Sequence, residues 1–224
     1  MADTTLALNI FADAMKHIAQ RGSNREVEWQ RSVDYRDFGE SDLLRQSAWV
    51  VLCSGFRVSR VEQIFDHISL CFCDWESAHA IVSTFPACRD AALASFRHRS
   101  KLDSIVEIAR RVYQEGFQAI KRKILCDPVS ELQTFPYIGH ITAAHLAKNL
   151  GWDLAKPDRH LARFAEYLGF SSVRDLCNTI ADATGEAVNV IDLILWRYLS
   201  DQRCPEYNMP AHCCPVKIRI NSIA

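Results

Sequence analysis

Apolar residues recur three and four positions apart along most of this chain, which is the period of an α-helix with one buried face. In the first such segment Leu6, Ile10, Ala14 and Ile18 share a face, and Gly22 follows its end. We find no convincing run of alternating apolar and polar residues of the kind that indicates a strand. The pattern therefore predicts an all-α fold. The expected helices cover about 4–20, 41–55, 58–70, 75–84, 87–94, 100–114, 117–125, 129–134, 142–150, 159–168, 172–183 and 187–200.

Several expected helices carry boundary signals in the sequence. Ser41 precedes a first turn rich in carboxylates, Pro128 stands at a helix start, and Gly151 and Gly169 follow helix ends. The proline-containing tail 203–224 has no helical period, so we expect it to be irregular and docked on the surface.

Composition places the chain among soluble globular proteins. Its 224 residues are 49% hydrophobic and 24% charged, which suits a protein with a proper core. No apolar run approaches the roughly 18 residues of a membrane span, and the N-terminal segment is too acidic for a secretory signal. We expect a monomer in the cytoplasm, working at the nucleoid. The nine cysteines are scattered and odd in number, so we expect reduced thiols that pack as small hydrophobes.

Charge is uneven along the chain although the formal net charge is only −1. Residues 89–123 hold nine basic and four acidic side chains. Such a run forms either a solvated helix face or a set of contacts to DNA phosphates, and charge alone leaves both open. The motif that follows it favours DNA, with Arg99 and Lys101 as candidate contacts.

That motif lies between Leu132 and Gly169 and has the pattern of two helices joined by a tight hairpin, followed by an aspartate at the start of the next helix. Phe135-Pro136-Tyr137-Ile138-Gly139-His140 connects one short helix to the next, and Gly139 permits a tight turn and a close approach by a ligand. The amides at the start of the second helix would then bind an anion such as a DNA phosphate. An ordinary αα-hairpin with a glycine in its turn, which binds no ligand, is the alternative interpretation of the same sequence.

Asp158 opens the next predicted helix. The apolar spacing of Leu161, Phe164, Ala165 and Leu168 makes it the expected N-cap, which is a sufficient structural reason for an aspartate. The helix dipole and amide donors also favour the charged form of a carboxylate there. Such a group could stabilise the oxocarbenium-like sugar that forms when a glycosidic bond breaks.

The stretch 132–169 resembles the helix–hairpin–helix/Gly-Pro-Asp superfamily of DNA glycosylases, relatives of endonuclease III, and a weaker likeness extends over about 41–199. The resemblance implies that Asp158 is the catalytic aspartate. It implies that Gly139 and Thr142 belong to the DNA-binding hairpin, with Tyr137 and His140 beside them. It also implies two helical lobes, 58–150 with the hairpin and 1–57 plus 151–224, with the active site in the cleft between them.

The departures from this family pattern carry predictions of their own. Tyr137 stands where family hairpins usually have glycine, so it is expected to alter the turn or pack against DNA. Ile141 replaces the lysine of members that also cleave the backbone by Schiff-base chemistry, which implies a glycosylase without that lyase activity. The cysteines of the tail, Cys204, Cys213 and Cys214, do not have the spacing of the family's iron–sulfur loop, and His212 adds no Cys-x-x-Cys pair for zinc. We expect no metal and no cofactor.

The flipped base needs a pocket and a side chain that fills its place in the duplex. By the resemblance, the helix end at 49–57 contributes, with Ser54, Phe56 and Arg57 as candidate contacts, and Trp29 is a candidate stacking surface. Packing in the core is the alternative for the aromatic residues. The small residues Cys53, Ser54 and Gly55 leave room for a bulky modified base.

These observations predict an enzyme, a monofunctional DNA N-glycosylase. It would flip a damaged or modified base out of double-stranded DNA and hydrolyse its N-glycosidic bond to leave an abasic site. The role would be base excision repair or removal of modified bases, including the enlarged cytosines of phage DNA. Three alternatives stay open: a non-catalytic helix–hairpin–helix DNA-binding protein, a bifunctional glycosylase/lyase, and a structural helical protein unrelated to DNA.

Overall fold

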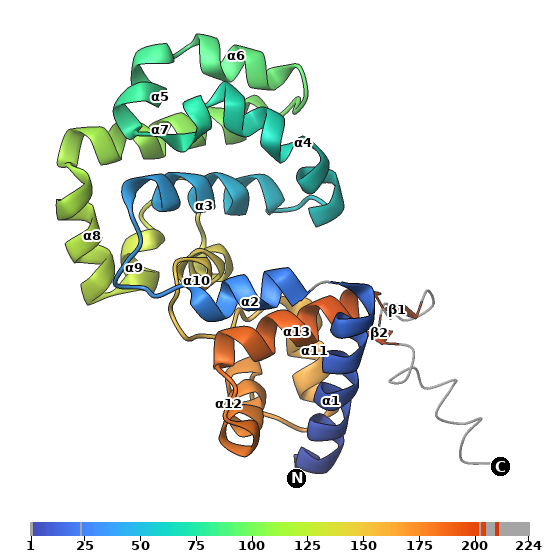
Figure 1. Cartoon of the computed structure of the whole chain (residues 1–224). Coiled ribbons are helices and arrows are strands. Elements are labelled where there is room, and N and C mark those ends of the chain that lie inside the picture. The colour runs from blue at the N-terminus through green and yellow to red at the C-terminus, as the bar shows by residue number, and fades with distance from the viewer. Residues whose placement is uncertain (1, 23, 202, 205–208, 211–224) are drawn as a thin grey trace. The chain divides into compact units, whose positions relative to one another are not determined.

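The computed structural model describes residues 2–22, 24–201, 203–204 and 209–210, and confirms the all-α fold (Figure 1). The helices are α1 (Thr4–Arg21), α2 (Asn24–Ser32), α3 (Glu40–Cys53), α4 (Val58–Cys71), the 3-10 turn η1 (Cys73–Trp75), α5 (Ala78–Thr84), α6 (Ala87–Leu93), α7 (Arg99–Glu115), α8 (Phe117–Cys126), α9 (Pro128–Leu132), α10 (His140–Asn149), α11 (Arg159–Tyr167), α12 (Val173–Thr184) and α13 (Val188–Asp201).

The tail contains one short pair of strands within its described residues. β1 (Arg203–Cys204) and β2 (Met209–Pro210) pair antiparallel, so the expectation of an irregular tail is wrong there. The remaining tail positions, including His212, Cys213 and Cys214, lie outside the described residues.

The chain divides into two compact units. Unit 1 combines Met1–Ser32 with Asp153–Ala224, and unit 2 is the continuous segment Val33–Trp152. The sequence prediction placed residues 33–57 with the chain ends, and this assignment is corrected. The reason is that α3 packs against α7 and α10, so its apolar face belongs to the core of unit 2.

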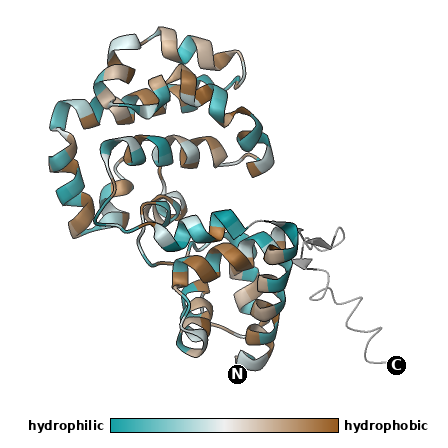
Figure 2. Cartoon of the chain, in the orientation of Figure 1, coloured by the Kyte–Doolittle hydropathy of each residue, from teal (hydrophilic) through white to brown (hydrophobic). Residues whose placement is uncertain are grey.

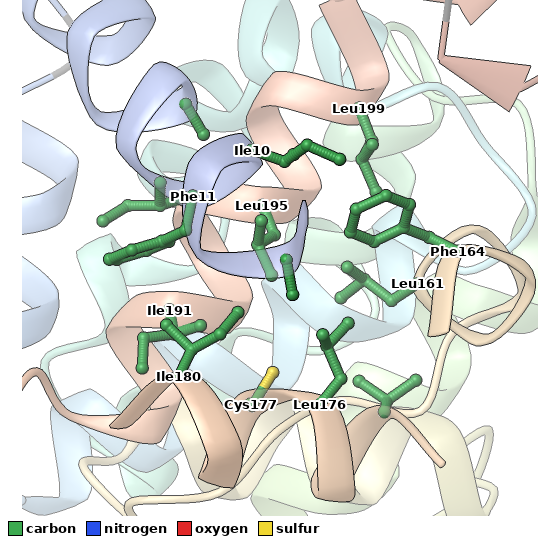
Figure 3. Close-up of a cluster of buried hydrophobic side chains, with 14 of the residues drawn as sticks. Ile10, Phe11, Leu161, Phe164, Leu176, Cys177, Ile180, Ile191, Leu195 and Leu199 are labelled. Carbon is green, nitrogen blue, oxygen red and sulfur yellow. The ribbon is translucent and has the colours of Figure 1, made fainter. Parts of the chain in front are cut away.

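Unit 1 is built around α13. Figure 3 shows Ile10 and Phe11 of α1 facing Ile191 and Leu195 of α13, with side chains of α11 and α12 closing the same cluster. The residues Val190, Ile191, Ile194 and Leu195 of α13 are all fully buried. Figure 2 shows α13 as mostly hydrophobic along its length, as expected for a helix that neighbours cover on several sides.

Unit 2 is built around α7, which lies beside α3, α5 and α6 (Figure 1). Next to it, the buried Trp75 ring stacks on Phe72 and Phe65, with ring centroids 5.4 and 6.0 Å away. The Trp75 indole N–H donates to Ser69 Oγ at 2.8 Å, so its polar atom is satisfied. Gly151 follows the end of α10. The position requires glycine, because the backbone has φ +100° and an added Cβ would lie 2.5 Å from the Tyr35 backbone nitrogen.

None of the helices in the described ranges has the length and apolar character needed to cross a bilayer.

Candidate nucleic-acid interface and active-site residues

The turn between α9 and α10 differs in detail from the sequence prediction. Gly139 has φ −89° and ψ −178°, which is extended backbone that any residue adopts. Tyr137 instead takes the left-handed conformation, with φ +64°. The expectation that Gly139 provides the tight turn is therefore corrected: Tyr137 makes it, at the strain that a residue with a Cβ meets there.

The N-terminus of α10 is open to a ligand. Gly139 is its N-cap and offers no side chain, and among the described hydrogen bonds the amides of His140, Ile141 and Thr142 have no acceptor. The Thr142 hydroxyl donates to the Gly139 carbonyl oxygen at 2.9 Å, and no side chain caps these amides. Gly139 and His140 are exposed. Free amides and the positive end of the helix dipole together suit an anion.

Asp158 is the N-cap of α11, as the apolar spacing predicts. Its Oδ1 accepts hydrogen bonds from the amides of His160 at 2.8 Å and Leu161 at 3.0 Å. Its Oδ2 lies 3.6 Å from Lys156 Nζ, and 12% of the side chain is exposed. One oxygen therefore holds the helix, while the other faces a cation.

The loop before Asp158 is tied to α13 by two carboxylates. Asp192 Oδ1 accepts from the Lys156 amide at 2.9 Å, and Asp153 Oδ1 accepts from the Asn189 amide at 2.9 Å. Sequence reasoning assigned no role to Asp192. Its signal was a carboxylate inside an otherwise apolar helix, where a buried charge needs a partner.

Lys101 does not fit its assignment as a DNA contact. The side chain is only 3% exposed, and its ammonium donates to the backbone carbonyls of Val51, Leu52 and Ser54 at the end of α3. Burial lowers the pKa of this lysine to about 8. The last carbonyls of α3 have no helical partner, so Lys101 satisfies them instead.

Four of the nine basic side chains of the segment 89–123 form ion pairs inside unit 2. The ion pairs join Arg89 to Asp90 and Asp103, Arg110 to Glu107, Arg111 to Glu115 and Glu131, and Lys123 to Glu115. Lys121 donates to the Phe38 carbonyl oxygen at 2.7 Å. Arg99, the first residue of α7, is exposed and makes no ion pair within the described residues. It keeps its place as a candidate phosphate contact.

The candidate pocket residues fall in both units. Ser54 ends α3, Phe56 is 40% exposed, and Arg57 is exposed at the start of α4, all in unit 2. Trp29 is an exposed residue of α2 in unit 1. The structure thus brings Ser54, Phe56 and Lys101 together with the hairpin residue Tyr137, whose ring lies 5.7 Å from the ammonium of Lys101.

In the described part of the chain, no group of three or more histidine, cysteine or acidic side chains is arranged to hold a metal ion. Six cysteines form no disulfide among the described residues: Cys53, Cys71, Cys73, Cys88, Cys126 and Cys177.

No protein-family model matches this chain, and no curated protein matches its sequence. Its fold is similar to that in the crystal structure of the 8-oxoguanine DNA glycosylase of Thermotoga maritima. The TM-score is 0.57 with 18% sequence identity, over 86% of this chain and 95% of the other. This similarity shows the fold: the chain has the all-helical fold of that glycosylase.

Proposed function

We propose that this protein is a monofunctional DNA glycosylase that acts as a monomer on double-stranded DNA in the cytoplasm. It would flip a damaged or modified base out of the duplex and hydrolyse its N-glycosidic bond. The observation that carries the proposal is Asp158: a carboxylate held through Oδ1 by two amides at a helix start, with its second oxygen 3.6 Å from Lys156 Nζ. The fold likeness and the open N-terminus of α10 support the same function.

The chemistry follows from the charge of Asp158. As the bond between the base and C1′ lengthens, the sugar becomes electron-poor, and an ionised carboxylate beside it stabilises that charge. The same carboxylate can orient a water molecule and accept its proton as the water oxygen bonds to C1′. The base leaves with the bonding electron pair and is protonated, and an abasic sugar remains.

DNA would be held by the hairpin. The free amides of His140, Ile141 and Thr142 suit a phosphate, and Gly139 has no Cβ to keep that phosphate at a distance. Arg99 would add a second phosphate contact. Ser54, Phe56, Arg57 and Trp29 remain proposed contacts of the flipped base or of the gap that it leaves.

The test is base release by the purified protein from a panel of modified duplexes. The panel holds 8-oxoguanine, the base for which the similar Thermotoga maritima glycosylase is named, together with alkylated purines, mismatched bases and enlarged modified cytosines. Mass spectrometry identifies the released base. We expect Asp158→Asn to lower the release rate at least about 100-fold, because the negative charge at the reacting sugar is lost. DNA affinity should persist.

The matched control is Ser172→Ala. Ser172 caps α12 as Asp158 caps α11, by accepting an amide hydrogen bond at 3.1 Å. Its loss should cost about 1 kcal/mol of stability but leave base release intact. Asp158→Asn keeps the Oδ1 acceptor and should melt near the wild type. If it still releases base, the hydrolytic mechanism is wrong. DNA binding without release from any duplex would favour a non-catalytic module.

The second candidate function is a glycosylase with lyase activity. The position of the Lys156 amine beside Asp158 favours it. This amine lies 3.6 Å from Asp158 Oδ2, although Lys156 does not stand at the family's lysine position, which Ile141 occupies. A deprotonated Lys156 could attack C1′, expel the base and form an imine. Borohydride would trap that adduct on DNA. We expect base release without a trapped adduct; an adduct that Lys156→Gln abolishes would establish the lyase.

A further inference from the structure

Four rings from three separate segments of unit 2 form one aromatic cluster: Phe56, Phe96, His98 and Tyr137. Phe56 and Phe96 have centroids 5.0 Å apart, Phe96 and His98 6.1 Å apart, and His98 and Tyr137 6.2 Å apart. Phe96 is buried beneath the others, whereas Phe56 is 40% and Tyr137 45% exposed. Unit 2 therefore presents a group of packed rings at its surface.

The ammonium of Lys101 contacts the two exposed rings. Lys101 Nζ lies 5.1 Å from the Phe56 centroid and 5.7 Å from that of Tyr137, and the carbonyls at the end of α3 fix the ammonium. Tyr137 also reaches this position through a left-handed backbone, which a bulky residue adopts only at a cost. Burial does not explain that cost, since nearly half of the side chain faces solvent.

The charges around the aromatic cluster favour an anionic partner. Arg57 follows Phe56, and Arg97 and Arg99 flank His98. All three side chains are exposed, and none forms an ion pair among the described residues. This contrasts with the arginines farther along α7, Arg110 and Arg111, which carboxylates neutralise.

We propose that the aromatic cluster is a stacking surface for an unpaired base of single-stranded DNA, with Arg57, Arg97 and Arg99 binding the phosphates on either side. A base offers a flat π-face that rings of this kind bind without regard to sequence, and its backbone supplies the negative charge. An acidic peptide would satisfy the arginines but leave the rings exposed. The site lies wholly in unit 2 and needs neither Asp158 nor base release.

The experiment measures binding of a fluorescein-labelled oligothymidylate of about ten nucleotides to the full-length protein by anisotropy. Tyr137→Gly removes the ring and suits the left-handed backbone, so the fold should be kept or stabilised. We expect this variant to bind about tenfold more weakly. The control is Tyr113→Ala, because Tyr113 is an exposed tyrosine of the same unit that lies against His79 instead. Its affinity should equal that of the wild type.

Two further measurements separate stacking from charge. An oligonucleotide of equal length made of abasic sites should bind the wild type and Tyr137→Gly equally, because it has no base to stack. Arg97→Gln should reduce the salt slope of binding by about 0.7, whereas Tyr137→Gly should leave that slope unchanged.

The proposal is overturned if Tyr137→Gly binds oligothymidylate as the wild type does, or if polyglutamate competes as well as DNA of the same charge. The surface shares Phe56, Arg57 and Arg99 with the DNA contacts of the proposed function, but it does not depend on Asp158 or on base release. Asp158→Asn should bind oligothymidylate with unchanged affinity. Binding by a wild-type protein that releases no base from any duplex would sink the glycosylase while leaving the stacking surface in place.

Discussion

At the scale of single residues, a comparison of two glycine N-caps of unit 2, Gly39 and Gly139, shows what Gly139 is for. Gly39 caps α3 with φ −95° and ψ −179°, and Gly139 caps α10 with nearly the same angles. Neither backbone needs glycine, and an added Cβ would meet only Asp42 Oδ2 at 3.5 Å or Thr142 Oγ1 at 3.9 Å. Folding therefore does not require glycine at position 139. Close approach by a phosphate would require it.

Gly139→Ala should fold with a stability within about 1 kcal/mol of the wild type, because alanine adopts this backbone without strain. It should weaken duplex binding about tenfold, since its methyl group would hold a phosphate away from the free amides. Gly39→Ala is the matched control and should bind as the wild type does. Thermal melts and anisotropy check both variants. Equal affinities for the two would show that α10 does not bind DNA by its amides.

Lys101 gives a prediction for pH. Burial lowers its pKa in the folded protein to about 8, against about 10.4 for lysine in an unfolded chain. Between these values the unfolded state binds more protons, so this group makes the folded state more stable as the pH rises. We expect the stability difference between wild type and Lys101→Met to grow in favour of the wild type by about 2 kcal/mol from pH 7 to about pH 9.5. Urea unfolding at both pH values measures it, and a constant difference would contradict a depressed pKa.

The same residues show which residue roles could be predicted from the sequence and which could not. Asp158 was predicted as an N-cap because four apolar positions fix where α11 begins. Lys101 was wrongly predicted to be an exposed DNA contact. A lysine in a run of basic residues is expected to be exposed unless the carbonyl groups that accept its hydrogen bonds are known. Those carbonyls belong to α3, about 50 positions earlier in the chain. The left-handed Tyr137 was missed for a similar reason: local sequence does not decide which residue of the turn takes the strain.

At the scale of elements, helices with a strong apolar stripe were predicted within about two residues, whereas α2 was missed entirely. Its sequence, Asn24–Ser32, buries only Val27 and Gln30, and Figure 2 shows it as mostly hydrophilic. Ion pairs hold it to distant segments, Glu26 to Arg197 at 2.8 Å and Arg31 to Glu186. A periodic pattern cannot reveal a helix that is stabilised by partners more than 150 positions away.

Helix α7 allows a test of which charges meet DNA. Arg99 at its start has no carboxylate partner in the described structure, whereas Arg110 pairs with Glu107 at 2.7 Å on the same helix. Arg99→Gln should weaken duplex binding and lower the salt slope by about 0.9, the value for one lost phosphate contact. Arg110→Gln should leave the slope unchanged. Anisotropy titrations over a range of salt concentrations measure both, and equal slopes for the two variants would remove Arg99 from the interface.

At the scale of the whole molecule, the fold class could be predicted from the sequence, whereas the division into units could not. The family resemblance placed residues 33–57 with the chain ends, while in the structure the buried residues of α3, such as Leu43 and Leu52, face α7 and α10. Apolar spacing shows that a helix buries one face. It does not show which distant helix covers that face, so topology needed the structure.

The continuity of unit 2 leads to the last prediction. Residues 33–152 form one uninterrupted segment of ordinary domain size with its own core around Trp75 and α7. Expressed alone, this segment should be helical by circular dichroism and unfold cooperatively. Since it contains the hairpin and the aromatic cluster, it should bind oligothymidylate with an affinity near that of the full chain, and release no base because Asp158 is absent.

Unit 1 supplies the opposite case, because its core joins the two ends of the chain. Ile10 and Phe11 of α1 belong to the same buried cluster as side chains of α12 and α13 (Figure 3), so the segment from residue 153 onward would expose Ile180, Ile191 and Leu195 when made alone. Losing a single buried side chain of this kind costs about 2–5 kcal/mol, and removing α1 takes away several at once. We expect that segment to fold only when the N-terminal residues are supplied with it. Cooperative unfolding by 153–224 alone, or its absence in 33–152, would contradict the division into two units.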